Sequence, residues 1–203
     1  LSSREGIVTP FLDCLFTATS ATCVTGLVLH DTALYWSPFG QLVILLLIQV
    51  GGMGVVTIAV AIFMFAGKRI GLKQRWVMQE SISAPQVGGI VRMTGFILKT
   101  AFLIEGIGAL LLALRFCPQF GLGRGLWYAV FHSVSAFCNA GFDLMGVNSP
   151  FSSLTDYVGD PLVSNVIAFL IIIGGVGFLT WNDIREHKLH FRRYRLQSKL
   201  ILT

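Results

Sequence analysis

The apolar residues of this chain gather into long runs separated by short polar tracts. Three runs hold about 20 or more residues each, namely about Phe39 to Phe65, about Met93 to Phe116, and about Leu162 to Trp181. A helix of ~20 residues crosses a hydrocarbon core of ~30 Å. The pattern therefore predicts three membrane-spanning helices.

Two further apolar stretches are too short to cross. They run from Pro10 to Ala21 and from Gly125 to Phe137, which is 12 and 13 residues. Helices of this length rise only ~18 to 20 Å, so we expect them to enter the membrane and return. The Thr9-Pro10 pair favours a helix start near Pro10, because a hydroxyl can cap free amides and proline suits the first helical position.

Each short stretch leads into a copy of one unusual segment. Phe16 to Leu27 reads FTATSATCVTGL and Phe131 to Phe142 reads FHSVSAFCNAGF, 115 residues further on. A second matching pair, Gly51 to Thr57 and Gly174 to Thr180, is 123 residues apart. The chain is therefore an internal repeat, and the difference of eight residues predicts an insertion in the loop between Asp143 and Pro161.

Composition and charge place this repeat in a membrane. Of the residues 54% are hydrophobic and 12% charged, and the mean hydropathy is +0.74. Eleven of the fifteen basic residues lie between Ala66 and Arg92 or after Asp183, which predicts a cytoplasmic position for both segments and makes a nucleic-acid partner improbable. The acidic residues on the opposite side are Glu5, Asp13, Asp31, Asp143, Asp156 and Asp160.

Neither catalytic nor cofactor-binding motifs stand out in the sequence. The four cysteines, Cys14, Cys23, Cys117 and Cys138, lack a CxxC spacing and a histidine cluster suited to zinc, so they are expected to be free thiols. The chain has no phosphate loop and no GxGxxG motif. A membrane enzyme would need a nucleophile, base or metal set at membrane depth, and a purely structural subunit is the other alternative from a different class.

The repeated motifs resemble the Trk/Ktr/HKT superfamily of potassium transporters, most closely its KtrB-like and TrkH-like subunits. The resemblance spans nearly the whole chain. It is carried by Thr17 to Ala21 with Val24 to Leu27, by Ile48 to Gly54, by Asn139 to Phe142, and by Ile173 to Phe178. It implies an all-α membrane protein in which repeated units of helix, re-entrant pore loop and helix surround a central ion pore.

The resemblance also implies a domain organisation. Residues 1–65 would form a first repeat that lacks its first helix, and 66–92 a cytoplasmic connector. Residues 93–182 would form a complete second repeat, and 183–203 a cytoplasmic tail that leads toward a third. Because the family has four such units around its pore, we expect this chain to be a fragment of a longer polypeptide.

In this family the transported potassium ion is held by backbone carbonyls of the pore loops. Such carbonyls replace the hydration shell without a trapping charge, and glycine permits the unusual backbone that this requires. Carried over residue by residue, the ligands are carbonyls of Cys23, Val24, Thr25, Gly26, Cys138, Asn139, Ala140 and Gly141. The alternative is a sodium-permeable or sodium-coupled member of the superfamily.

Resemblance further implies potassium uptake across the plasma membrane by a multi-pass homodimer. Its gating would come from a cytoplasmic ring of regulatory subunits, so that any nucleotide binds the partner and this chain has no cofactor of its own. Gly71 to Gly89 mixes basic and apolar residues and would lie on the lipid surface or dock that partner.

Three interpretations remain open from sequence alone. The glycines of the two GGxG motifs permit close helix packing or act as a hinge or a widening of the inner pore. Glu105 pairs with a group on another helix or relays protons. His132, which replaces a threonine-like position, is a packing histidine or a pH-sensitive site.

Overall fold

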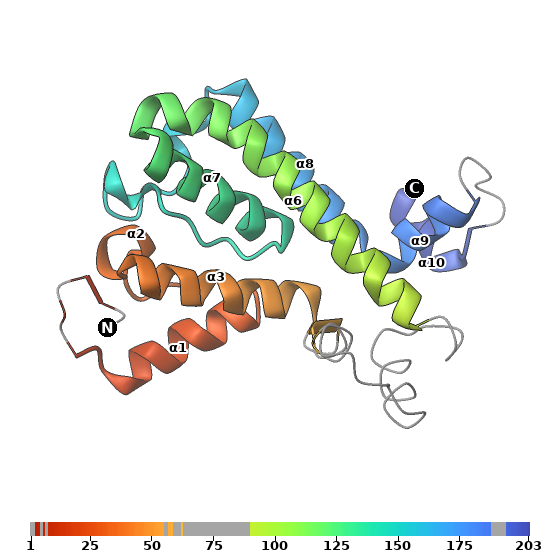
Figure 1. Ribbon diagram of the computed structural model, residues 1–203, viewed down its shortest axis with the longest axis horizontal. Coiled ribbons are helices and arrows are strands. Elements are labelled where there is room, and N and C mark those ends of the chain that lie inside the picture. The colour runs from red at the N-terminus through yellow and green to blue at the C-terminus, as the bar shows by residue number, and fades with distance from the viewer. Residues whose placement is uncertain are drawn as a thin grey trace.

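The computed structural model describes Ser3, Arg4, Gly6, residues 8–54, 57, 58, 62, 90–187 and 194–203. Within these ranges the regular elements are all helices, apart from one isolated antiparallel bridge between Ser3 and Trp36. The predicted all-helical class is therefore confirmed. The elements, shown in Figure 1, are α1 (Phe11–Thr22), α2 (Thr32–Tyr35), α3 (Pro38–Met53), α6 (Ile90–Phe120), α7 (Leu122–Phe137), η2 (Met145–Val147), η3 (Thr155–Tyr157), α8 (Pro161–Val176), α9 (Phe178–His187) and α10 (Leu196–Leu202).

Two parts of the chain have the same local design. In each, a short helix (α1 or α7) leads through a loop to a 16-residue helix (α3 or α8) that begins with proline. Ser37 caps α3 by accepting a hydrogen bond from the Gly40 amide at 3.2 Å. Asp160 caps α8 by accepting from the amides of Leu162 and Val163 at 3.0 and 3.2 Å. Side-chain caps and an N-terminal proline satisfy the free helix ends, which fixes where both helices begin.

One described helix is long and apolar enough to cross a membrane by itself. It is the segment Thr94–Phe120 of α6, with 27 residues and a mean hydropathy of 2.0. The predicted end near Phe116 is four residues too early, since α6 runs through Pro118 to Phe120. The Phe120 ring meets Tyr128 of α7 at 5.1 Å between centroids, so the last turn is held by packing against the next helix.

The other two predicted spans are each interrupted by a glycine. α3 ends at Met53 before Gly54, which has φ +82°, and α8 ends at Val176 before Gly177, which has φ +83°. A left-handed residue interrupts the helical hydrogen bonds, while the apolar composition simply continues. The helices Pro161–Val176 and Thr180–His187 meet at 87°, and counted as one broken span they raise the number of candidate spans to two. Residues 55, 56, 59–61 and 63–65 of the first run lie outside the described ranges.

Both short helices form, with shifted starts. α1 begins at Phe11 with Pro10 as its N-cap and no capping side chain; Thr9 instead accepts a hydrogen bond from the Tyr35 hydroxyl at 3.1 Å. α7 begins at Leu122 rather than Gly125, because Gly121 turns the chain at φ +82° directly after α6. Neither helix is long enough to cross a bilayer.

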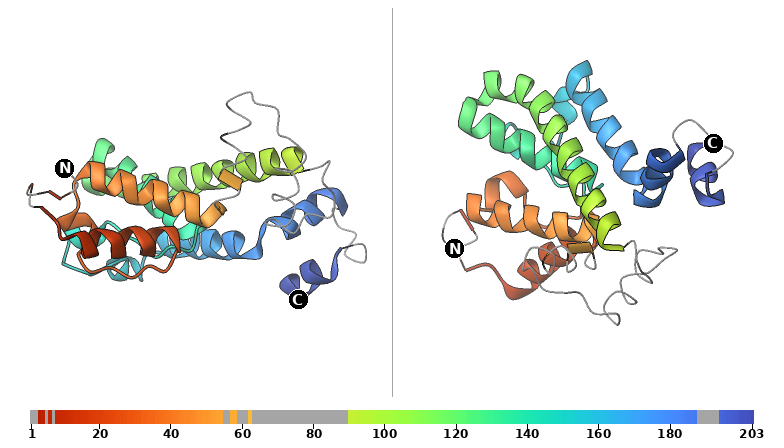
Figure 2. Two further views of the ribbon diagram at one scale, coloured as in Figure 1. Left: turned by 90° about the horizontal axis from the view of Figure 1, so that it is seen from below. Right: turned by 45° about the vertical axis from the view of Figure 1, so that its right-hand side comes forward.

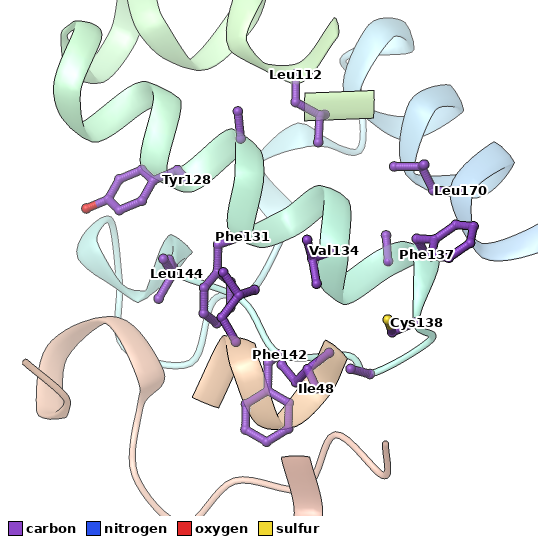
Figure 3. Packing of buried hydrophobic residues seen from close by; sticks show 14 of the residues in the cluster. Ile48, Leu112, Tyr128, Phe131, Val134, Phe137, Cys138, Phe142, Leu144 and Leu170 are labelled. Atoms are coloured by element: carbon purple, nitrogen blue, oxygen red, sulfur yellow. The ribbon is translucent and has the colours of Figure 1, made fainter. Parts of the chain in front are cut away.

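The hydrophobic core surrounds α7. Figure 3 shows Leu112 of α6 and Leu170 of α8 on one side of this helix, and Ile48 of α3 on the other, near Phe131 and Phe142. α7 therefore lies between the first and second parts of the chain and packs on both. The views in Figure 2 place α9 and α10 at the end of the molecule away from the N-terminus.

Candidate functional site

Two loops that follow α1 and α7 contain all of the predicted cation ligands. We call Cys23 to Gly26 the first loop and Cys138 to Gly141 the second loop. Each begins at a helix C-cap, where the amide of Cys23 donates to the Thr19 carbonyl at 2.8 Å and that of Cys138 to the Val134 carbonyl at 2.9 Å. The helices α1 and α7 thus fix both loops at the same point of the repeat.

The two loops share an alternating backbone. Val24 and Gly26 have φ values of +58° and +74°, and Asn139 and Gly141 have +59° and +73°. The residues between them are outside this left-handed region. Positive φ at every second residue is an unusual backbone, and a cation path lined by peptide carbonyls requires an unusual backbone.

A short hydrogen-bond ladder holds each loop against its helix. The Thr25 amide donates to the Ser20 carbonyl at 3.0 Å, and the Ala140 amide to the Ser135 carbonyl at 2.8 Å. Backbone groups that are buried away from water require such partners. The match between the two ladders extends the sequence repeat to individual hydrogen bonds.

One buried serine hydroxyl binds the residue that follows each loop. Ser20 Oγ donates to the Leu27 carbonyl at 2.7 Å, and Ser135 Oγ donates to the Phe142 carbonyl at 2.6 Å. The repeat could have identified this pair from sequence, since Ser135 aligns with Ser20 at the offset of 115 residues.

The loops meet at their glycines. A Cβ placed on Gly26 would lie 2.6 Å from the Ala140 carbonyl oxygen, and one on Gly141 would lie 3.5 Å from the Gly26 Cα. Gly26 therefore needs glycine twice, for the positive φ and for the close approach, whereas Gly141 needs it for the positive φ alone. Segments that are 115 residues apart in sequence form one site.

The loops differ in how much of each residue is exposed. Cys23 and Thr25 of the first loop are exposed, with Val24 and Gly26 intermediate. In the second loop Asn139 and Gly141 are exposed, whereas Cys138 and Ala140 are buried. All eight predicted residues lie in one continuous region, and their solvent access alternates in both loops.

Three further polar side chains in or beside the loops divide into two groups. Thr25 Oγ1 bonds to Ser20 Oγ at 2.8 Å, and Asn139 Nδ2 donates to the Ile171 carbonyl of α8 at 3.4 Å, so both hold a loop. The Thr22 hydroxyl instead donates back to Ala18 within α1 at 2.8 Å.

The glycines of each GGxG motif have two different structural roles. A Cβ on Gly51 would overlap the Thr22 carbonyl oxygen, and one on Gly174 would overlap the Phe137 carbonyl oxygen, so these glycines let α3 and α8 contact the ends of α1 and α7. Gly54 and Gly177 instead end their helices with positive φ. Packing and helix interruption therefore belong to different glycines of each motif.

His132 and Glu105 both have partners. His132 Nδ1 lies 2.7 Å from the Tyr128 carbonyl, and its Nε2 lies 3.3 Å from the Leu144 amide. An amide only donates and a carbonyl only accepts, so the ring is neutral with its proton on Nδ1. Glu105 accepts from Gln49 of α3. These contacts favour the packing interpretation of His132 and the pairing interpretation of Glu105.

Asp31 and Asp160, which precede α2 and α8, accept hydrogen bonds from other segments. Asp31 accepts from the amides of Ala33 and Phe151 at 2.9 and 2.8 Å, which joins α2 to the inserted loop. Asp160 accepts from Arg115 Nε at 2.6 Å. That hydrogen bond from Arg115 holds the pKa of the Asp160 carboxyl below its usual range.

Comparison with known proteins gives one family. A family model described as "TrkH: Cation transport protein" matches residues 3–201. The chain is 46% identical over 193 residues to the "Ktr system potassium uptake protein B" of Bacillus subtilis, covering 95% of this chain and 42% of that protein. It is 42% identical over 201 residues to the "Potassium/sodium uptake protein NtpJ" of Enterococcus hirae, covering 99% and 43% respectively. A third relative, the "Ktr system potassium uptake protein B" of Vibrio alginolyticus, is 37% identical over 194 residues, which is 94% of this chain and 42% of that protein. The chain thus spans about four-tenths of the length of these relatives.

Proposed function

Because the chain belongs to the TrkH family of cation transport proteins, we propose that its two loops form part of a potassium-selective path across the cell membrane. The family is one of membrane transporters, so the chain is not an enzyme and the resemblance of its motifs is confirmed. The observation that carries the proposal is the meeting of two loops with the same alternating backbone at Gly26 and Gly141.

The ion ligands in this proposal are backbone carbonyls. The first loop contributes those of Cys23 to Gly26, and the second those of Cys138 to Gly141. A dehydrated potassium ion needs several oxygen ligands, and a ring of carbonyl dipoles supplies them with no fixed charge that would prevent its release. The C-terminal ends of α1 and α7 point at the loops, so their negative dipole ends add to the attraction for a cation.

The proposed chain organisation follows the two similar parts of the fold. Residues 1–65 and 93–182 are two repeats of a larger pore, joined by a cytoplasmic connector over 66–92 and followed by a cytoplasmic tail over 183–203. The basic residues of the connector and tail support this orientation in the plasma membrane. Further repeats of the same kind would complete the ring around the ion.

Potassium is preferred over sodium in this proposal because both loops carry glycine at the point where they meet. One relative is named as a potassium/sodium uptake protein, so sodium-permeable or sodium-coupled transport is the second candidate. Relatives named as parts of a Ktr system support a regulatory partner. We propose that this partner is a cytoplasmic nucleotide-binding ring and that the transporter is a homodimer.

The test is ion flux through the complete protein in liposomes. Potassium and sodium fluxes are compared for the wild type, Gly141→Ser and the control Gly123→Ser, whose added Cβ has no neighbour within 4 Å. We expect strong potassium preference that weakens only in Gly141→Ser. Equal flux of both ions in the wild type, unaltered by Gly141→Ser, would refute the proposal.

A further inference from the structure

A carboxyl group lies buried at membrane depth on α6. Glu105 is 4% exposed, and its carboxyl oxygens accept from Gln49 Nε2 at 2.9 and 3.1 Å. Its backbone carbonyl accepts from Ser133 Oγ of α7 at 2.6 Å. The ion pairs found among the described residues are His30–Asp13, Arg115–Asp160 and Arg195–Asp183, and none of them includes Glu105.

The hydrogen bonds use both carboxyl oxygens of Glu105 as acceptors. An ionised carboxylate accepts through both oxygens, whereas a carboxylic acid has a hydroxyl that donates. The side-chain amide of Gln49 donates to both oxygens of Glu105 at nearly equal distances. A carboxylate in the membrane interior is costly unless a cation lies near it, and an amide donor supplies no charge.

The carboxylate lies near the start of the second loop. Its partner Gln49 is on the face of α3 that meets Cys138, the first residue of that loop. Gly52, one turn along α3 from Gln49, packs against the Cys138 side chain. The same helix face of α3 therefore contacts both Glu105 and the second loop.

We infer that Glu105 is an affinity-determining residue for the transported cation, whose positive charge in the second loop is the counterion of the buried carboxylate. This inference rests on the proposed function. Gln49 is a positioning residue, because its amide orients the carboxylate and does not itself face the ion path. The cation then interacts with the carbonyls in front of it and with one full negative charge behind them.

The test compares potassium flux of the complete protein in liposomes over a range of potassium concentrations. Glu105→Gln removes the charge and keeps the size of the side chain, while Ser133→Ala loosens the same α6–α7 contact and keeps the charge. We expect Glu105→Gln to raise the half-saturating potassium concentration about tenfold with little change in maximal flux. A tenfold change equals ~1.4 kcal/mol, close to the interaction of two unit charges ~10 Å apart at an effective dielectric near 20. Ser133→Ala should leave the half-saturating concentration unchanged.

Two outcomes would overturn the inference while the wild type still carries potassium selectively. One is an unchanged half-saturating concentration in Glu105→Gln, and the other is an equal rise in Ser133→Ala. If Glu105→Gln fails to fold, Glu105→Asp provides the test, because it keeps the charge and should stay within about threefold of the wild type. A tenfold rise in Glu105→Asp would show that side-chain geometry matters rather than charge. A wild type without selective flux would refute the proposed function instead.

Discussion

Replacing Ser135 with alanine removes one buried hydroxyl from behind the second loop. Ser135 is 3% exposed, and its Oγ donates to the Phe142 carbonyl at 2.6 Å. Without that hydroxyl the carbonyl is buried and unsatisfied, which costs about 1–3 kcal/mol of folding free energy. The Ser135 backbone carbonyl still accepts from the Ala140 amide, so the change isolates the hydroxyl.

Two readouts follow from that loss. Thermal unfolding of the purified complete protein in detergent should show a lower stability, and flux in liposomes should show a weaker preference for potassium over sodium. The preference weakens because Phe142 directly follows Gly141. When the Phe142 carbonyl loses its donor, its peptide group reorients, and this changes the direction of the carbonyls before it. Ser20→Ala, at the aligned position of the first loop, should act in the same direction.

The control is Thr155→Ala. Thr155 Oγ1 donates to the Ser152 carbonyl, also at 2.6 Å, but in an exposed loop. Water can replace that bond, so a change below about 0.5 kcal/mol is expected and ion preference should be unaltered. If Ser135→Ala behaves like Thr155→Ala in both assays, the hydroxyl does not fasten the loop and the argument is wrong.

Two further changes test other contacts by thermal unfolding. Gly174→Ala places a methyl group against the Phe137 carbonyl and should destabilise by about 1–3 kcal/mol, whereas the control Gly175→Ala has nothing within 4 Å of its Cβ and should be neutral or stabilising; equal effects would contradict the packing role. Asp160→Asn loses the Arg115 partner that lowers the carboxyl pKa, so native Asp160 adds stability above about pH 4 that disappears as the pH falls through its lowered value. The stability difference between wild type and variant should therefore be present at pH 7 and shrink progressively as the pH falls below about 4; a difference independent of pH would count against the ion pair.

Sequence predicts the loops better than it predicts the helix ends. The aligned Gly26 and Gly141 were expected to share an unusual backbone, and both have positive φ. This prediction works because the reason for glycine at these positions is local and steric: glycine adopts a positive φ without a clash. The helix ends at Gly54 and Gly177 were missed, because hydropathy averages over a window in which one glycine changes little.

Contacts between distant segments needed the fold. The pairing of Glu105 with Gln49 joins residues 56 positions apart on two helices, and neither neighbourhood contains a motif. The failure of Thr9 to cap α1 has a similar cause, since the Tyr35 hydroxyl 26 positions away uses its oxygen as acceptor. In both cases a partner that is distant in sequence determines the hydrogen bond that the side chain makes.

The two loops are alike in backbone and unlike in their fastening. In the second, the imidazole of His132 accepts from the Leu144 amide, while Ser135 holds the Phe142 carbonyl, so the strand beyond Gly141 is bound at two points. The aligned residue of the first repeat is Thr17, whose side chain is much shorter than an imidazole. Protonation of His132 would remove the acceptor for the Leu144 amide, so the ring works as a holder only while it is neutral. Of the two interpretations that the sequence left open for His132, the contacts favour the packing histidine, which holds the outgoing strand of one repeat.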